Sequence, residues 1–232
     1  MNAVILDFDG VVVDSIEECY QVAKEAYFGF ADIPVNEKAL KEVFFKYRGI
    51  VRPAYQYLFL MRAIVENDCA DRKNGIYSRF YELEEATDQS VRAHFETVFF
   101  GLRGLKQQDI QSWIQLNPLT EYGKTLVGKK LGDYCIVTTK DRFSVEQLLM
   151  HNNIAIDLIY DRDDYKQYGN KGEIITKFLD ENEQYESAIF VDDAAEHLDT
   201  VKDSRVKNYF ADWGYGENTG YEIFDPARQG GG

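Results

Sequence analysis

Two carboxylates separated by a single residue, Asp7 and Asp9, follow a short apolar run at residues 3–6. That run is too short for a helical period and predicts a buried strand. Side chains alternate along a strand, so both carboxylates point to the same side, and Gly10 lets the backbone turn just beyond them. Paired carboxylates at such a place repel each other and lose hydration, so they require a cation, naturally Mg²⁺, or a shared proton. One can then attack an electrophile while the other handles a proton, although Asp and Gly are also ordinary turn residues.

A hydroxyl and an ammonium occur later at places that suit an anionic ligand. Thr138 follows an apolar run at residues 133–137, where its hydroxyl and the next backbone amides can bind an anionic oxygen. A β-branched strand residue before a helix cap is the plain alternative. Lys171 opens a predicted helix, where acidic residues are usual, and its ammonium can neutralise both a carboxylate and a phosphate oxygen. Lys166 is near enough in sequence to compete for this place.

Two adjacent acids, Asp192 and Asp193, end another apolar run at residues 188–191. Turn chemistry alone does not explain two acids at the end of a buried strand. If this run and the one before Asp7 belong to one parallel sheet, their carboxyl ends share the edge where such sheets bind ligands. The pattern therefore predicts one acidic site that holds Mg²⁺.

The elements that must position these residues alternate beyond Pro118 between short apolar runs and helical segments. This alternation predicts a Rossmann-like α/β core with a parallel sheet covered on both faces. Residues 16–115 instead show aromatic and aliphatic residues at helical spacing, which predicts a bundle of helices. Ser15 and Glu18 have the spacing of a capping box at its start. The predicted strands are residues 3–6, 133–137, 156–160, 188–191 and 206–210, and the predicted core helices are 119–131, 145–151, 171–179 and one from 194.

Composition narrows the range of partners. The formal net charge of −14 and the 45% of apolar residues describe a globular acidic protein without the basic stripe that nucleic acid requires. No run approaches the ~18 apolar residues of a membrane helix, and no signal peptide opens the chain. Three widely spaced cysteines predict neither a disulfide framework nor a zinc site, so a cytoplasmic protein is expected. A small phosphorylated metabolite is the expected partner, and no pattern specifies an oligomeric state.

The motifs in this order resemble those of the haloacid dehalogenase-like (HAD) hydrolase superfamily. The resemblance rests on residues 7–15, residues 136–140, Lys171 and residues 189–196, and residues 212–216 resemble a loop common in phosphoglycolate phosphatase-like members. It implies a phosphatase whose nucleophile is Asp7 and whose acid and base is Asp9.

The same resemblance implies further roles. Thr138 and Lys171 would bind the phosphoryl group. Mg²⁺ would be held by Asp7, the backbone carbonyl of Asp9, and Asp193. The family pattern commonly reads Gly-Asp at 192–193, so Asp192 stands in place of a glycine and is expected to hold metal-bound water; this leaves open which acid binds the metal directly.

The helical segment resembles the cap of the subfamily that inserts it after the first motif. The expected domains are residues 1–15 with 116–228 as the core, 16–115 as the cap, and 229–232 as a flexible tail. Within the cap, Arg48 and Arg52 flank Gly49 in an otherwise acidic chain and are candidates for substrate selection, an exposed interhelical loop being the alternative. The rival functions are a phosphomutase of the β-phosphoglucomutase type and a non-catalytic binding or regulatory protein that retains the fold.

Overall fold

The computed structural model describes residues 1–29 and 35–228. The chain divides into two compact units, which we name the core unit (residues 1–14 and the chain from 118 onward) and the helical unit (Ser15–Asn117). The sequence predicts the helical unit at residues 16–115. The structure begins this unit one residue earlier and ends it two residues later. The expected flexible tail at residues 229–232 lies outside the described residues.

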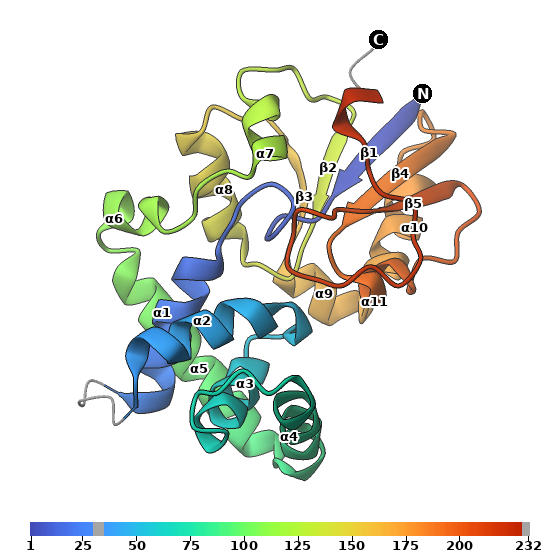
Figure 1. The fold of residues 1–232 in the computed structure, drawn as a ribbon. Helices are drawn as coiled ribbons and strands as arrows, with labels where there is room; N and C mark the ends of the chain where they lie inside the picture. Colours follow the sequence, from blue (N-terminus) through green and yellow to red (C-terminus); the bar gives the residue numbers. More distant parts are fainter. Residues whose placement is uncertain (30–34, 229–232) are drawn as a thin grey trace. The chain divides into compact units, whose positions relative to one another are not determined.

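The core unit is built on a five-stranded sheet whose neighbouring strands are all parallel (Figure 1). The strand order is β3-β2-β1-β4-β5. The α/β fold with a parallel, Rossmann-like sheet that the sequence predicts is therefore confirmed. The strands are β1 (Asn2–Leu6), β2 (Tyr134–Val137), β3 (Leu158–Tyr160), β4 (Ser187–Asp192) and β5 (Val206–Phe210).

The strand order determines where a ligand can bind. The chain runs outward from β1 through β2 to β3 and then returns to β4, on the other side of β1. Because parallel crossovers are right-handed, this reversal assigns the helices before and after it to opposite faces of the sheet. The crevice for ligands in such a sheet lies at the carboxyl ends of the two strands where the direction reverses, here β1 and β4. Asp7 and Asp192 stand at these two strand ends.

The helices of the core unit bury apolar sides against the sheet. On one face, Ile174, Ile175 and Phe178 of α10 pack with Ile5 of β1 and Phe190 of β4, all at most 1% exposed. This face is a continuous apolar layer beneath the strand ends that carry the acids. The helices are α7 (Glu121–Leu126), α8 (Arg142–His151), α9 (Arg162–Tyr168), α10 (Lys171–Glu181) and α11 (Ala195–Leu198), and a 3₁₀ turn, η2 (Pro226–Arg228), follows later.

Helix α7 is shorter than the predicted segment 119–131. It ends at Leu126 because Gly128 takes a φ of 70°, a left-handed conformation that an α-helix does not contain. The Gly128 amide then donates to the carbonyl of Asn153, and Lys130 forms a bridge with Ala155. A long-range pairing therefore replaced the last helical turn, which periodicity in sequence did not reveal.

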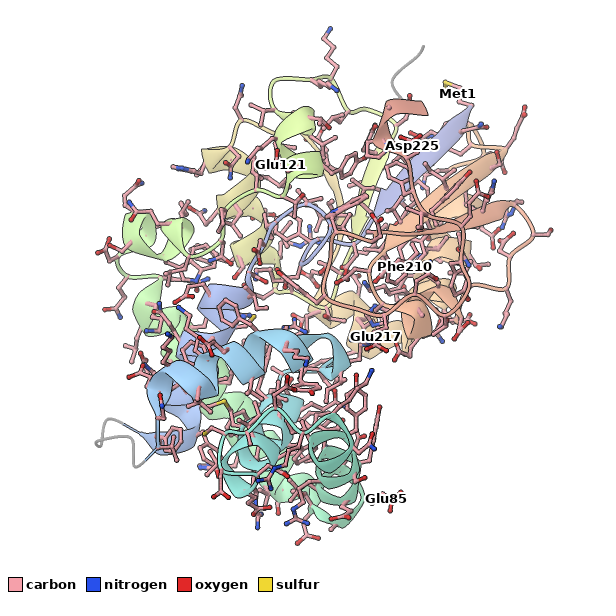
Figure 2. The ribbon with its side chains drawn as sticks, viewed as in Figure 1. Met1, Glu85, Glu121, Phe210, Glu217 and Asp225 are labelled. Carbon is pink, nitrogen blue, oxygen red and sulfur yellow. The ribbon has the colours of Figure 1, made fainter. Side chains whose placement is uncertain are left out.

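The helical unit has an aromatic core. The ring of Tyr57 stacks between Phe44 and Phe99, with centroid distances of 5.7 and 5.1 Å. In the described ranges no helix is long and apolar enough to cross a membrane. The exposed side chain of Glu85, near the end of α4, points away from the ribbon (Figure 2). The elements are α1 (Ile16–Phe28), α2 (Glu37–Tyr47), η1 (Arg48–Ile50), α3 (Gln56–Glu66), α4 (Lys73–Ala86), α5 (Gln89–Lys106) and α6 (Ile110–Gln115).

A buried ion pair replaces the capping box expected at the start of α1. Ser15 makes no side-chain cap to α1, and Glu18 instead accepts two hydrogen bonds from Arg103 of α5, at 2.8 and 2.9 Å. Glu18 is completely buried, and the indole Nε1 of Trp113 lies 3.4 Å from one of its oxygens. The expected cap was wrong because a buried carboxylate gains more from a bidentate guanidinium than from a backbone amide.

Candidate active site

The first carboxylate of the site, Asp7, lies directly after β1 and contacts Lys171, the first residue of α10. The Lys171 ammonium is fully buried and lies 2.8 Å from Asp7 Oδ1 and 2.7 Å from Asp192 Oδ2. The start of α10 is attached to the segment that follows α11, because the Gly172 amide donates to Thr200 Oγ1 at 3.0 Å. The Lys171 ammonium therefore contacts the carboxylates at the ends of β1 and β4, which are far apart in sequence.

The two carboxylates that contact Lys171 have pKa values shifted in opposite directions. Burial raises the pKa of Asp7 above its ordinary value, against the opposing effect of Lys171. Burial also disfavours ionised Asp192, yet Lys171 and His197 hold the pKa of Asp192 well below its usual range. For Lys171, burial alone would lower the pKa, but Asp192 and Asp7 raise it. Asp192 is therefore well compensated, whereas Asp7 still gains from a further cation.

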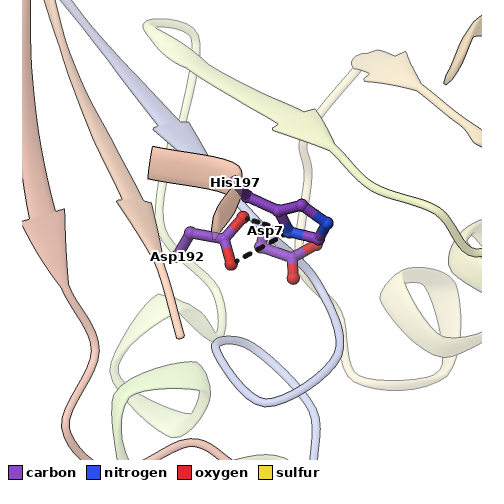
Figure 3. A group of neighbouring side chains, drawn as sticks. All are labelled: Asp7, Asp192 and His197. Carbon is purple, nitrogen blue, oxygen red and sulfur yellow. Dashed lines mark hydrogen bonds and ion pairs between the residues drawn. The ribbon is translucent and has the colours of Figure 1, made fainter. Parts of the chain in front are cut away.

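Asp192 makes contacts through both of its oxygens. Its Oδ1 accepts from the Ala194 amide at 2.8 Å, and its Oδ2 lies 2.7 Å from Lys171 Nζ and 3.2 Å from His197 Nδ1. Figure 3 shows His197 beside Asp192, with Asp7 next to them. Within the described residues, Asp7, Asp192 and His197 offer ligand atoms within 4.8 Å of one another. Because the Lys171 ammonium already lies between the two carboxylates, we interpret this group as an ammonium site.

The second carboxylate, Asp9, lies in a turn and pairs with Lys140. The turn is closed by the Gly10 amide, which donates to the Val13 carbonyl at 2.7 Å, and Gly10 has a φ of 85° that favours glycine. Lys140 Nζ lies 3.0 and 3.3 Å from the two carboxylate oxygens of Asp9. Asp9 thus faces an ammonium from the loop after β2.

Thr138 follows β2 and is 1% exposed. Its hydroxyl oxygen accepts from the Lys140 amide at 3.2 Å, which fixes the hydroxyl while its own hydrogen can still be donated. An anionic oxygen is a suitable acceptor for that hydrogen. The role of Thr138 in binding a phosphoryl oxygen stays a prediction.

Asp193 is enclosed by the first turn and by a loop after β5. The Tyr215 amide donates to Asp193 Oδ2 at 2.6 Å, and a Cβ added at Gly10 would lie 2.4 Å from that oxygen. A Cβ at Gly214 would lie 2.2 Å from Asp193 Cβ, and one at Gly216 would lie 1.9 Å from the Asp193 backbone oxygen. Glycine is therefore required at all three positions for the carboxylate to be where it is.

The loop at residues 213–216 also holds the segment that follows Asp9. Trp213 Nε1 donates to the Val11 carbonyl at 3.2 Å, and the Tyr215 hydroxyl donates to Asp14 at 3.0 Å. The loop therefore joins the first motif to Asp193. In this way a segment more than 200 residues along the chain contributes to the placement of the first motif.

The charge of the site fits a divalent cation. Four carboxylates and two ammonium groups sum to two negative charges, which one Mg²⁺ would neutralise. Oxygen donors of carboxylates are the ligands that Mg²⁺ prefers. The raised pKa of Asp7 points the same way, since a cation beside it would offset its burial. The charged residues are Asp7, Asp9, Asp192, Asp193, Lys140 and Lys171.

The remaining candidates are Lys166, Arg48 and Arg52. Lys166, the alternative to Lys171, is exposed on α9. Arg48 is 8% exposed in the helical unit, where it donates to the Val51 carbonyl and its guanidinium lies 5.1 Å from the Tyr57 ring centroid. Arg52 is half-buried and donates to the same carbonyl at 3.0 Å.

Sequence reasoning missed three contributions to the site. Lys140 was read as part of the Thr138 motif without a role, although a lysine in the loop that follows a buried strand was the available signal. His197 carried no signal, because a single histidine after an acidic pair has many explanations. The loop of Tyr215 resembled a family motif, but its contact with Asp193 depends on tertiary structure.

Comparison with known proteins identifies the family. The model of the haloacid dehalogenase-like hydrolases matches residues 1–204, and the chain belongs to that family. The membership that the motifs indicated is confirmed, and with it the expectation of a hydrolase. No curated protein matches the sequence.

Several solved structures share the fold of this chain. A haloacid dehalogenase-like hydrolase from Streptococcus pneumoniae is 16% identical with a TM-score of 0.64, covering 98% of this chain and 96% of that one. A protein described as a predicted phosphoglycolate phosphatase from Haemophilus somnus is 13% identical with a TM-score of 0.61, covering 97% and 94%. A family hydrolase from Bacillus subtilis, described as bound to magnesium, is 14% identical with a TM-score of 0.51, covering 90% and 87%.

Proposed function

We propose that the protein is a Mg²⁺-dependent phosphomonoesterase that acts on a small phosphorylated metabolite through an aspartyl-phosphate. The observation that carries the proposal is that each carboxylate of the first motif faces its own buried ammonium, Asp7 facing Lys171 and Asp9 facing Lys140. A nucleophile and an acid–base group are thereby held separately at one edge of the sheet. The phosphatase description of a structural relative, from Haemophilus somnus, supports the same reaction class.

In the first step, a carboxylate oxygen of Asp7 attacks phosphorus and the bond from phosphorus to the ester oxygen breaks. Asp9 gives its proton to that leaving oxygen. The Thr138 hydroxyl donates to a phosphoryl oxygen, and the Lys171 ammonium offsets the charge of Asp7 and of the phosphoryl group. In the second step water attacks phosphorus while Asp9 takes one of its protons. The bond between phosphorus and the Asp7 oxygen breaks, which releases inorganic phosphate and returns Asp7 to its carboxylate form.

The residues that would hold Mg²⁺ are Asp7, Asp193 and the backbone carbonyl of Asp9. When bound, the ion supplies positive charge that stabilises the phosphoryl oxygens. We assign Asp192 to holding Lys171, because Lys171, His197 and the Ala194 amide already engage its two oxygens. The helical unit, through Arg48 or Arg52, is the proposed selector of the substrate. The three free, buried cysteines support the expected cytoplasmic location.

A phosphate-release screen over phosphorylated metabolites, with Mg²⁺ and with EDTA, tests the proposal. We expect metal-dependent release, its abolition in Asp7→Asn, and a loss of ~10²–10⁴-fold in Asp9→Asn, the usual effect of general acid–base catalysis. Ordinary turnover by Asp7→Asn would exclude the covalent route. Conversion of a sugar phosphate to its isomer without net release would identify a phosphomutase instead.

A further inference from the structure

Lys140 is a second fully buried lysine, and it takes no part in the bond-making and proton-transfer steps proposed above. Its side chain has no solvent exposure, and its Nζ lies 3.0 and 3.3 Å from the two carboxylate oxygens of Asp9. Its backbone is fixed on both sides, because its amide donates to Thr138 Oγ1 and its carbonyl accepts from the Arg162 amide. The ammonium is thus delivered to Asp9 by a rigid turn.

Burying the Lys140 ammonium is energetically unfavourable unless a paired carboxylate offsets the loss of hydration. Lysine is rarely buried completely, and removing an ammonium from water costs several kcal/mol before pairing. Pairing for solubility or surface stability would leave Lys140 exposed, as Lys207 is at 57% beside Glu222. The partner here, Asp9, is the group on which both proton transfers of the proposed function depend, and its side chain is 18% exposed.

We propose that Lys140 is a positioning residue that fixes the carboxyl plane of Asp9 for proton transfer. The inference rests on the proposed function. Contact with both oxygens restrains rotation about the Cβ–Cγ bond, so the orientation of the Asp9 carboxyl group is fixed before the proton is transferred. Lys140 keeps its own protons throughout; the proton moves only between Asp9 and the leaving oxygen or water. Positioning of this kind matters because a misplacement of ~1 Å costs on the order of 10²-fold in rate.

The test compares leaving groups. Esters with an alkoxide leaving group need a proton from Asp9, whereas 2,4-dinitrophenyl phosphate does not, and kcat/KM reports the first phosphoryl transfer for both. For Lys140→Met we expect kcat/KM to fall by ~10²-fold for an alkyl phosphate, the scale of lost positioning, with only a small change for the dinitrophenyl ester. Lys140→Gln, which can still donate to Asp9, should lose less. Lys207→Met is the matched control, and kcat/KM for both esters should be the same in this variant as in the unmodified protein.

A double-mutant comparison shows whether Lys140 acts through Asp9. Asp9→Asn combined with Lys140→Met should be no slower than Asp9→Asn alone, because the residue to be positioned is already absent. Thermal unfolding of each variant monitors folding, and Lys140→Gln carries the comparison if Lys140→Met does not fold. Equal losses for both esters, or full additivity in the double variant, would overturn the inference. Absence of any leaving-group dependence in Asp9→Asn would instead overturn the proposed function.

Discussion

Gly216→Ala tests whether the loop after β5 places Asp193 in the site. A Cβ at this position would lie 1.9 Å from the Asp193 backbone oxygen, and the obstacle is backbone, which cannot rotate away as a side chain can. Ordinary contact begins near 3.4 Å, so the loop and Asp193 must separate by about 1.5 Å. Part of that shift would reach the Asp193 carboxylate, to which the neighbouring Tyr215 amide donates.

The expected effects follow from the size of this displacement. Overpacking of this kind costs about 1–3 kcal/mol of unfolding free energy, which the fold can tolerate. A shift of ~1 Å in a catalytic group costs on the order of 10²-fold in rate. We therefore expect a folded protein with a raised half-saturating Mg²⁺ concentration and a turnover reduced by about that factor.

The assay is phosphate release as a function of Mg²⁺ concentration, with thermal unfolding measured in parallel. The matched control is Gly132→Ala, an exposed loop position where an added Cβ meets nothing within 4 Å. Its Mg²⁺ dependence and turnover should equal those of the unmodified protein. If Gly216→Ala behaved like Gly132→Ala, the close approach of the loop would not be what positions Asp193, and the reasoning would be refuted.

Two further predictions concern the acidic pair and the helical unit. Asp193→Ala should weaken Mg²⁺ binding in calorimetric titration more than Asp192→Ala. Asp192→Ala should instead lower the unfolding temperature more, because loss of one partner of a buried ion pair costs about 3–5 kcal/mol. Equal or reversed metal affinities would mean that the ligand is misassigned. Arg48→Ala and Arg52→Ala should each raise KM for the true metabolite with p-nitrophenyl phosphate hydrolysis nearly unchanged. An equal effect on both substrates, or none, would remove the arginines from substrate selection.

Much of the core could be predicted because its signals are local. Runs such as residues 188–191 are apolar, short and followed by acids, which predicts both a buried strand and the edge at which a ligand binds. Asp7, Asp9, Thr138 and Lys171 could be proposed for the same reason, since each lies next to a recognisable strand or helix end. These features depend on neighbours in sequence, so one sequence contains enough information to find them.

Local signals failed where a distant group offered a better partner. Glu18 has the spacing of a capping box, yet it pairs with Arg103, which lies 85 residues away. Gly128 interrupts the helix predicted through residue 131 because its amide pairs with Asn153. A helix cap contributes only about 1 kcal/mol, and neither local pattern shows which distant group will be within reach in the fold.

The division of work within the site depends on contacts across the sheet. Only the strand order brings Lys140 to Asp9, 131 residues away, and Tyr215 to Asp193, 22 residues away. The sequence by itself determined which side chains stand at strand ends, because alternation and burial are properties of each segment. The tertiary structure decided which ammonium faces which carboxylate, because such a pairing depends on how the strand ends and their loops are arranged in space.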